Sequence, residues 1–287
     1  MVEPLPSIVC GVDRSPGAHA AARFAGDLAS RLALRVVLVY VVPPPIPQSE
    51  LGMAARTTDA AVIEDLRKAG VKLLDEVARE LELDHDREAI GQIKFGGASE
   101  ALSAVAESER AESVVVGSRG LGSVGTLLLG SVSLRLAVHG PCPTVIVPES
   151  AGTVGDSPIM CAVDDSEEAR AGVSIAATLS ERLKTKLLLV HAAPDDAPSG
   201  VGNELLARLV VESGLGTQVE RLVIRGDPAQ AIVDAAATHR VGMLVIGSRG
   251  RGALASAALG SVSSAVARRS PCAVTIVRAR YADSAES

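Results

Sequence analysis

Residues 7–15, "SIVCGVDRS", return in altered form as "PIMCAVDDS" at residues 158–166, a shift of 151 positions. In both places a short apolar run leads to an aspartate. The segment "VLVYVVP" at residues 37–43 returns as "LLVHAAP" at residues 188–194 with the same shift. Repetition at a fixed distance indicates a duplicated structural unit.

The repetition continues with a smaller shift toward the end of the chain. "FGGASEAL" at residues 95–102 matches "RGDPAQAI" at residues 225–232, a shift of 130. "GPCPTVIV", ending at Val147, matches "SPCAVTIV", ending at Val277, with the same shift. The second copy is therefore 21 residues shorter, and the loss lies between its second and third strand-like runs.

These matches predict two tandem domains. We expect them to span residues 1–150 and 155–281. The join is expected in "PESAGTVGDSP", residues 148–158, which is rich in small, polar and turn-forming residues.

Each copy alternates short apolar runs with amphipathic segments. The apolar runs of the first copy fall near residues 7–12, 35–42, 89–95, 112–117 and 143–148. Segments between them, such as "GAHAAARFAGDLASRLA", have the helical period. Apolar strands with helical connections predict a parallel sheet covered on both faces. The expected fold class is α/β, with two tandem doubly wound domains (flavodoxin-like or Rossmann-like), each a five-stranded, mostly parallel sheet with helices on both faces.

The composition argues against several classes of protein. The chain has 287 residues, of which 47% are hydrophobic and 1% aromatic, with no tryptophan. Few aromatic rings are left to stack on single-stranded nucleic acid, and a net charge of -6 lacks the basic footprint of a nucleic-acid binder. No apolar run reaches the length of a membrane span, and "MVEPLPSIVCGVD" has no basic leader. We expect a cytoplasmic protein with no membrane segment.

The four cysteines have no C-x-x-C spacing, so we expect no metal site and reduced, buried thiols. They are Cys10, Cys142, Cys161 and Cys272.

The segment "VVVGSRGLGSVGTLLLGSVS", residues 114–133, contains the spelling G-x-G-x-x-G at Gly120, Gly122 and Gly125. A dinucleotide fingerprint belongs after the first strand of its unit, whereas these glycines follow the fourth. The second copy also has Ala255 where the last glycine should be. The segment lacks the lysine of a P-loop as well. Both readings are therefore disfavoured.

Both copies share the spacing G-x2-G-x9-G-S. It consists of Gly117, Gly120, Gly130 and Ser131 in the first copy, and of Gly247, Gly250, Gly260 and Ser261 in the second. Ligands of an open parallel sheet bind at the carboxyl ends of its strands, where these loops and the strand-tip residues Asp13 and Asp164 meet.

Glycines let the backbone approach a ligand closely, and "GSVS" opens a helix whose N-terminus attracts phosphate. The serines at 131 and 133, with those at 261 and 263, either donate hydroxyl groups to the ligand or cap the helix. The alternative is a glycine turn and a capped helix that bind nothing.

Four features occur in the same order in both copies: "GVDRS" or "AVDDS", "VGSRGLG" or "IGSRGRG", the G-x2-G-x9-G-S spacing, and the last strand "PCPTVIV" or "PCAVTIV". In this combination the chain resembles the universal stress protein family. The resemblance covers nearly the whole chain and is specific to tandem two-domain members. It implies the ATP-binding branch, because the other branch loses the glycine motif. It further implies a stress-response or signalling protein that takes up to two ATP molecules, with or without Mg²⁺.

The resemblance assigns a role to each site residue. Adenine is expected against the backbone around Val41 and Ala192, and ribose near Asp13 with Gly117 and near Asp164 with Gly247. The phosphate-contacting residues are expected to be Gly120, Gly130, Ser131, Val132 and Ser133 in the first copy, and Gly250, Gly260, Ser261, Val262 and Ser263 in the second.

Three positions near this site carry open alternatives. Gly11 lets the backbone come close in the first copy, where the second has Ala162. Arg119 and Arg249 either pair with a phosphate or are solvated. A strand-tip aspartate such as Asp13 is also a common helix N-cap.

The resemblance also implies antiparallel pairing of the last strands, Thr144–Val147 with Thr275–Val277, which would cover two apolar sheet edges. A homodimer and an unidentified protein partner are left open.

No catalytic set recurs between the copies, so any ATP hydrolysis is expected to be slow. The alternatives are a nucleotide hydrolase or transferase with Asp13 or Asp164 as base, a binder of AMP or cyclic AMP, and a ligand-free scaffold.

Overall fold

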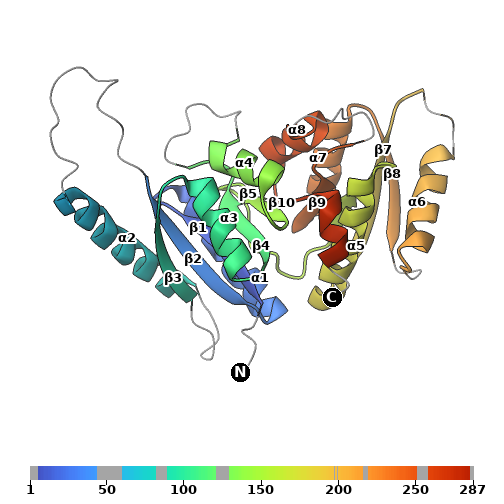
Figure 1. Ribbon diagram of the computed structural model, residues 1–287. Coiled ribbons are helices and arrows are strands. Elements are labelled where there is room, and N and C mark those ends of the chain that lie inside the picture. The colour runs from blue at the N-terminus through green and yellow to red at the C-terminus, as the bar shows by residue number, and fades with distance from the viewer. Residues whose placement is uncertain are drawn as a thin grey trace, which may run out of the picture.

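The computed structural model describes residues 6–43, 60–81, 89–120, 129–196, 198, 200–215, 219–250 and 258–284. This part of the chain forms a ten-stranded sheet with the order β3-β2-β1-β4-β5-β10-β9-β6-β7-β8 (Figure 1). The strands of the first half are β1 (Ser7–Val12), β2 (Arg35–Val42), β3 (Ala89–Phe95), β4 (Ala111–Gly117) and β5 (Thr144–Val147). Those of the second half are β6 (Ile159–Ala162), β7 (Leu187–Ala193), β8 (Glu220–Arg225), β9 (Met243–Gly247) and β10 (Ala273–Val277).

Helices cover both faces of the sheet. They are α1 (Pro16–Leu32), α2 (Ala60–Glu80), α3 (Ala98–Ser108), α4 (Ser131–His139), α5 (Glu167–Leu183), α6 (Val201–Glu212), α7 (Pro228–Thr238), α8 (Ser261–Arg269) and the 3-10 helix η2 (Ala279–Ser284). One hydrophobic cluster takes side chains from α1, α2, α5 and α6. Two further clusters take theirs from α3, α4, α7 and α8. Along β1, Ile8 and Cys10 join the first cluster and Val9 joins the opposite one, as strand alternation requires.

The predicted fold class is confirmed. Among the described residues each half has five strands, and all pairs within a half are parallel. The predicted strand positions hold within one residue: β4 begins at Ala111 instead of residue 112, and β5 is one residue shorter at each end than residues 143–148. Within each half the chain order reverses at the first strand, between β1 and β4 or between β6 and β9, which creates a switch point.

The two halves meet at β5 and β10, which form one antiparallel pair in the middle of the sheet (Figure 1). Val274 pairs with Ile146, Thr275 with Val145, and Ile276 with Thr144. This is the predicted pairing, and all of these residues are buried. The pair joins two five-stranded sheets into one and leaves neither apolar edge exposed.

Truncating a side chain in this seam should destabilise the protein. Ile276 is 1% exposed, so Ile276→Ala should lower the free energy of unfolding by about 2–5 kcal/mol, because the missing atoms leave a cavity. Val211, which is 79% exposed, gives the control: Val211→Ala should change it by less than about 0.5 kcal/mol. Urea denaturation measures both. Equal effects of the two substitutions would contradict a buried seam.

Candidate functional site

A cavity lies at the switch point of each half, beside the carboxyl ends of the first and fourth strands. The first-half cavity has a volume of about 440 Å³ and the second-half cavity about 620 Å³. Both volumes fall in the range of small-molecule sites, roughly 300–1,000 Å³.

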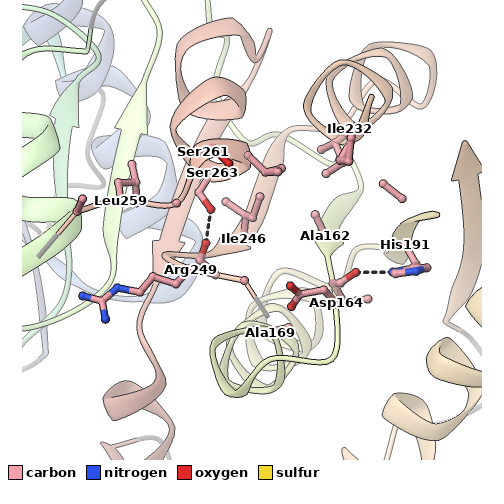
Figure 2. A pocket seen from close by; sticks show the side chains of 18 residues that line it. Ala162, Asp164, Ala169, His191, Ile232, Ile246, Arg249, Leu259, Ser261 and Ser263 are labelled. Carbon is pink, nitrogen blue, oxygen red and sulfur yellow. Dashed lines mark hydrogen bonds between the residues drawn. The ribbon is translucent and has the colours of Figure 1, made fainter. Parts of the chain in front are cut away.

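Every residue that the sequence nominated lines one of these cavities. The first is lined by Gly11, Asp13, Val41, Gly117, Arg119, Gly120, Gly130, Ser131, Val132 and Ser133. The second, shown in Figure 2, is lined by Asp164, Ala192, Gly247, Arg249, Gly250, Gly260, Ser261, Val262 and Ser263. The structure therefore brings together residues far apart in sequence. Their roles toward a ligand stay predictions.

Sequence reasoning missed the apolar walls of both cavities. Leu102, Val116 and Leu129 line the first, and Ile232, Ile246 and Leu259 line the second. The repeat held the signal, since each pair is separated by the same shift of 130 and is aliphatic in both copies. The dinucleotide-like pattern G-x-G-x-x-G also includes Gly122 and Gly125, and Ala255 stands at its last position in the second half. These three residues lie outside the described residues.

Asp13 holds the start of α1. Its Oδ1 accepts hydrogen bonds from the Ser15 backbone N–H at 2.8 Å and from Ser15 Oγ at 2.5 Å. Ser15 is the N-cap, and its Oγ accepts the Ala18 N–H at 3.2 Å. In the second half, Asp164 Oδ1 accepts from Ser166 N–H at 3.1 Å and from Ser166 Oγ at 2.5 Å.

The N-cap alternative for Asp13 is therefore wrong, because the serine two residues later caps the helix. The aspartate positions that serine, and its own carboxylate lines the cavity.

The glycines at 117 and 247 are required by packing alone. A Cβ on Gly117 would lie 2.7 Å from the carbonyl oxygen of Gly17, at the start of α1. A Cβ on Gly247 would lie 2.8 Å from the Cβ of Glu168 on α5. The first and fourth strands can bring the helix start this close to the loop only with glycine there. These two glycines need no ligand to explain them.

Gly120 has a different environment. A Cβ there would lie 2.7 Å from Asp13 Oδ2, and its next contact would be the Asp13 Cγ at 3.8 Å. In the second half a Cβ on Gly250 would lie 2.6 Å from Asp164 Oδ2. Neither residue is among the described residues with positive φ. Glycine at these positions therefore keeps space beside a carboxylate, in both halves.

The two serines of "GSVS" have separate roles. Ser133 is buried, and its Oγ donates to the Gly117 carbonyl at 2.7 Å; Ser263 donates to Gly247 at 2.6 Å. This bond fixes the last helix to the end of the fourth strand. Ser131 is the first residue of α4 and is exposed at the cavity.

The start of α4 faces the cavity with main-chain donors. The helix is capped by Gly130 without a side-chain hydrogen bond. The Gly130 N–H itself donates to the Ser118 carbonyl at 2.8 Å, and the Gly260 N–H donates to Ser248 at 2.8 Å. The N–H groups of the first helical turn have no acceptor inside the helix. With the positive end of the helix dipole they form a site suited to an anion.

Arg249 lines the second cavity. Figure 2 shows its guanidinium directed away from Asp164 and His191. Arg119 and Arg249 both line their cavities and are half-buried, so the sequence's two readings of them stay open.

The two cavities differ in several of their lining residues. His191 of β7 lines the second cavity, and its Nδ1 lies 2.9 Å from the Val163 carbonyl oxygen (Figure 2). Tyr40 holds the equivalent position in β2 but packs on Gly70 of α2 and does not line the first cavity. Pro228 of the second cavity replaces Ala98 of the first.

Some chemistry finds no support within the described part of the chain. No three His, Cys, Asp or Glu residues there gather as they would around a metal ion. No helix there has the length and apolar character to cross a membrane. Burial raises the pKa of the Cys10 thiol to about 12 and also raises that of Cys161, so neither supplies a thiolate nucleophile at neutral pH.

Comparison with known proteins agrees with this architecture. The model of the universal stress protein family matches residues 5–148 and again residues 157–278. The chain belongs to the universal stress protein family. Two universal stress proteins illustrate the similarity: one from Mycolicibacterium smegmatis is 30% identical over 95% of this chain and 97% of that protein. Rv2623 from Mycobacterium tuberculosis is 27% identical over 94% of this chain and 96% of that protein.

A solved structure shares the fold of the whole chain. The crystal structure of a universal stress protein from Archaeoglobus fulgidus has a TM-score of 0.71 and 22% identity. The alignment covers 95% of this chain and 98% of that one. The tandem arrangement therefore has a precedent among universal stress proteins.

Removing the buried hydroxyl of Ser133 should lower the stability of the fold, whereas removing the exposed hydroxyl of Ser131 should not. Ser133→Ala leaves the Gly117 carbonyl without this donor and should lower the free energy of unfolding by about 1–3 kcal/mol. Ser131→Ala, two residues away in the same turn, should change it by less than about 0.5 kcal/mol. Chemical denaturation compares the two variants. A larger loss for Ser131→Ala would reverse the assignment of roles.

Proposed function

We propose that both cavities bind an adenine nucleotide, ATP in the first place, and that the chain acts as a nucleotide-dependent stress-response or signalling protein with at most slow hydrolysis. One observation carries the proposal. In both halves an exposed serine at a helix N-terminus lines the same cavity as a strand-tip carboxylate and the glycine beside it. The contacts within the fold that account for Gly117 and Ser133 do not account for the exposed serine or for the glycine beside the carboxylate.

The phosphates are proposed to lie at the start of α4, on the N–H groups of Ser131, Val132 and Ser133 and the Ser131 hydroxyl. The same arrangement is proposed for α8 with Ser261, Val262 and Ser263. A helix N-terminus supplies neutral donors and partial positive charge, which suits phosphate without a lysine.

The ribose is proposed to lie near the strand-tip carboxylate. A carboxylate accepts hydrogen bonds readily, and vicinal hydroxyl groups donate them. Asp13 and Asp164 are positioned by two bonds from a serine, so each is held in place before a ligand arrives. Adenine is then proposed to lie against the apolar wall near Val41 in the first cavity and near Ala192 in the second.

A binding function is favoured over a hydrolase. Asp13 Oδ1 accepts two hydrogen bonds from Ser15, so this oxygen already serves to position the N-cap of α1. Fast ATP turnover that is lost in Asp13→Asn or Asp164→Asn would favour the hydrolase instead.

The domain bounds of 1–150 and 155–281 are likewise proposed, one domain for each family match.

A charge at the helix start should separate a phosphate site from a simple turn. Ser131→Glu places a carboxylate where the phosphates are proposed, which should weaken ATP binding in the first cavity roughly tenfold or more. The same carboxylate favours the helix dipole, so the unfolding free energy of the ligand-free protein should hold or rise. Calorimetric titration with ATP and Mg²⁺ measures the binding.

Ser131→Gln is the matched control, with a similar side chain and no charge, and it should bind ATP nearly as the unmodified protein does. Ser261→Glu repeats the test in the second cavity, and combining it with Ser131→Glu should remove both sites. If Ser131→Glu and Ser131→Gln bind ATP equally, the phosphates do not lie at α4.

The nucleotide itself should be recoverable from the protein. Acid denaturation of freshly purified protein, followed by mass spectrometry of the supernatant, should release ATP in up to two equivalents per chain. Release of AMP or cyclic AMP would keep the site and correct the ligand. A protein that releases none and shows no binding of any adenine nucleotide by calorimetry would be the ligand-free scaffold.

A further inference from the structure

The second cavity is lined by a histidine that has no counterpart in the lining of the first. His191 of β7 is part of the lining, whereas Tyr40, at the equivalent position of β2, is not. The other polar side chains of the second lining are those of Asp164, Arg249 and the serines of α8. The proposed nucleotide site gives His191 no role, so this side chain needs an explanation of its own.

The His191 ring is held on two sides. Its Nδ1 lies 2.9 Å from the carbonyl oxygen of Val163, the residue after β6. Its Cδ2 lies against α6, where a Cβ on Gly202 would come within 3.1 Å of it. These contacts fix the orientation of the ring before any ligand arrives. Such preorganisation is what a group that recognises a ligand requires.

The contact with Val163 also decides which ring nitrogen carries the proton. A carbonyl oxygen can only accept a hydrogen bond, so Nδ1 is the donor. In the neutral imidazole Nε2 is then an acceptor. Within the part of the chain that the structure describes, this nitrogen has no hydrogen-bond partner. His191 therefore offers an acceptor that the fold itself does not use.

The order of the polar groups across the cavity matches the order of groups in a nucleotide. Figure 2 shows His191 on the far side of Asp164 from Ser261. The phosphates are proposed to lie at Ser261 and the ribose near Asp164, which leaves the base nearest to His191. Ala192, the next residue of β7, lines the cavity as well and is the residue expected beside adenine.

An adenine nucleotide has few groups that can donate to such an acceptor. The ring nitrogens of adenine accept hydrogen bonds, and its exocyclic amino group donates them. Ionised phosphates offer acceptor oxygens. The remaining donors are the ribose hydroxyls, which are proposed to donate to Asp164. The exocyclic amino group is therefore the donor left for His191.

We propose that His191 determines the base specificity of the second cavity, because its Nε2 accepts a hydrogen bond from the exocyclic amino group of adenine. A purine with a carbonyl oxygen in place of that group, such as hypoxanthine, brings an acceptor against an acceptor and binds more weakly. The first cavity has no side chain of this kind at the equivalent position and should discriminate less. This inference rests on the proposed function and adds the recognition of the base.

The test compares ATP with purine riboside triphosphate, which lacks the amino group and is otherwise identical. Calorimetric titrations use the full-length chain with Ser131→Glu, so that the second cavity is measured alone. They are run at about pH 8, above the ordinary imidazole pKa. His191→Phe removes the acceptor and keeps a flat ring. It should weaken ATP binding roughly three- to tenfold, the loss of one hydrogen bond, and leave purine riboside triphosphate unchanged.

Two further variants separate the roles of the two ring nitrogens. The amide of asparagine reaches about as far as Nδ1, and that of glutamine about as far as Nε2. His191→Asn can keep the bond to the Val163 carbonyl but not the acceptor, so it should lose the preference for ATP. His191→Gln keeps an acceptor for the ligand and should retain most of that preference. A purely structural role of the histidine predicts the reverse order.

Tyr40→Phe is the matched control, because Tyr40 holds the equivalent strand position and does not line the first cavity. It should leave the binding of both nucleotides unchanged.

The possible failures can be told apart. If ATP binds and His191→Phe weakens neither nucleotide, or weakens both equally, His191 does not recognise the amino group and the inference is wrong. If the unmodified chain binds no adenine nucleotide at all, the proposed function itself fails, and the inference fails with it.

Discussion

The antiparallel pairing of β5 with β10 connects the two copies, and most other features of the molecule depend on it. Each copy alone would end in a short, mostly apolar edge strand, which invites pairing with another chain. The tandem arrangement satisfies both edges internally through residues such as Ile146 and Val274. The helices α1 and α5, one from each half, contact each other beside this pair. The same ladder therefore determines both the continuous sheet and the contact between the halves.

The glycine motif combines two demands that sequence alone does not separate. Gly117 and Ser133 serve the fold: the first allows the start of α1 to approach, and the second fixes α4 to the carbonyl at the end of β4. Gly120 and Ser131 have no comparable structural task, since the former leaves space beside Asp13 and the latter is exposed. A duplicated motif could persist for its turn geometry. Because turn geometry does not require Gly120 and Ser131, these two residues are the ones to test for a role in ligand binding.

Much of the fold could be predicted from sequence because the chain repeats itself. The shifts of 151 and 130 aligned the strands of the two halves, and the apolar last strands indicated their pairing. The gathering of the nominated residues followed from the rule that ligands bind at the carboxyl ends of parallel strands. The role of Ser15 as the cap of α1 was missed, because Asp13 is an equally good capping residue by type.

The contact of α1 with α5 could not be predicted at all. It depends on how one copy packs on the other, and a repeat carries no information about contacts between its copies.

The two candidate cavities differ at several lining positions: Ala162 and Pro228 replace Gly11 and Ala98, and His191 has no counterpart in the first lining. The start of the last helix has the same geometry in both halves: Ser133 and Ser263 make equivalent bonds, as do Gly130 and Gly260. At the second strand, Tyr40 and His191 each lie against a glycine of the following helix, Gly70 of α2 and Gly202 of α6, but only His191 lines its cavity.

An imidazole brings a hydrogen-bonding group to a wall that is otherwise aliphatic. If both cavities take nucleotides, their common feature is the recognition of phosphate, and any difference in preference must arise at the base and ribose. Selection between adenine nucleotides would then depend on the lining residues that differ between the halves, such as His191, and not on the glycine motif that the two halves share.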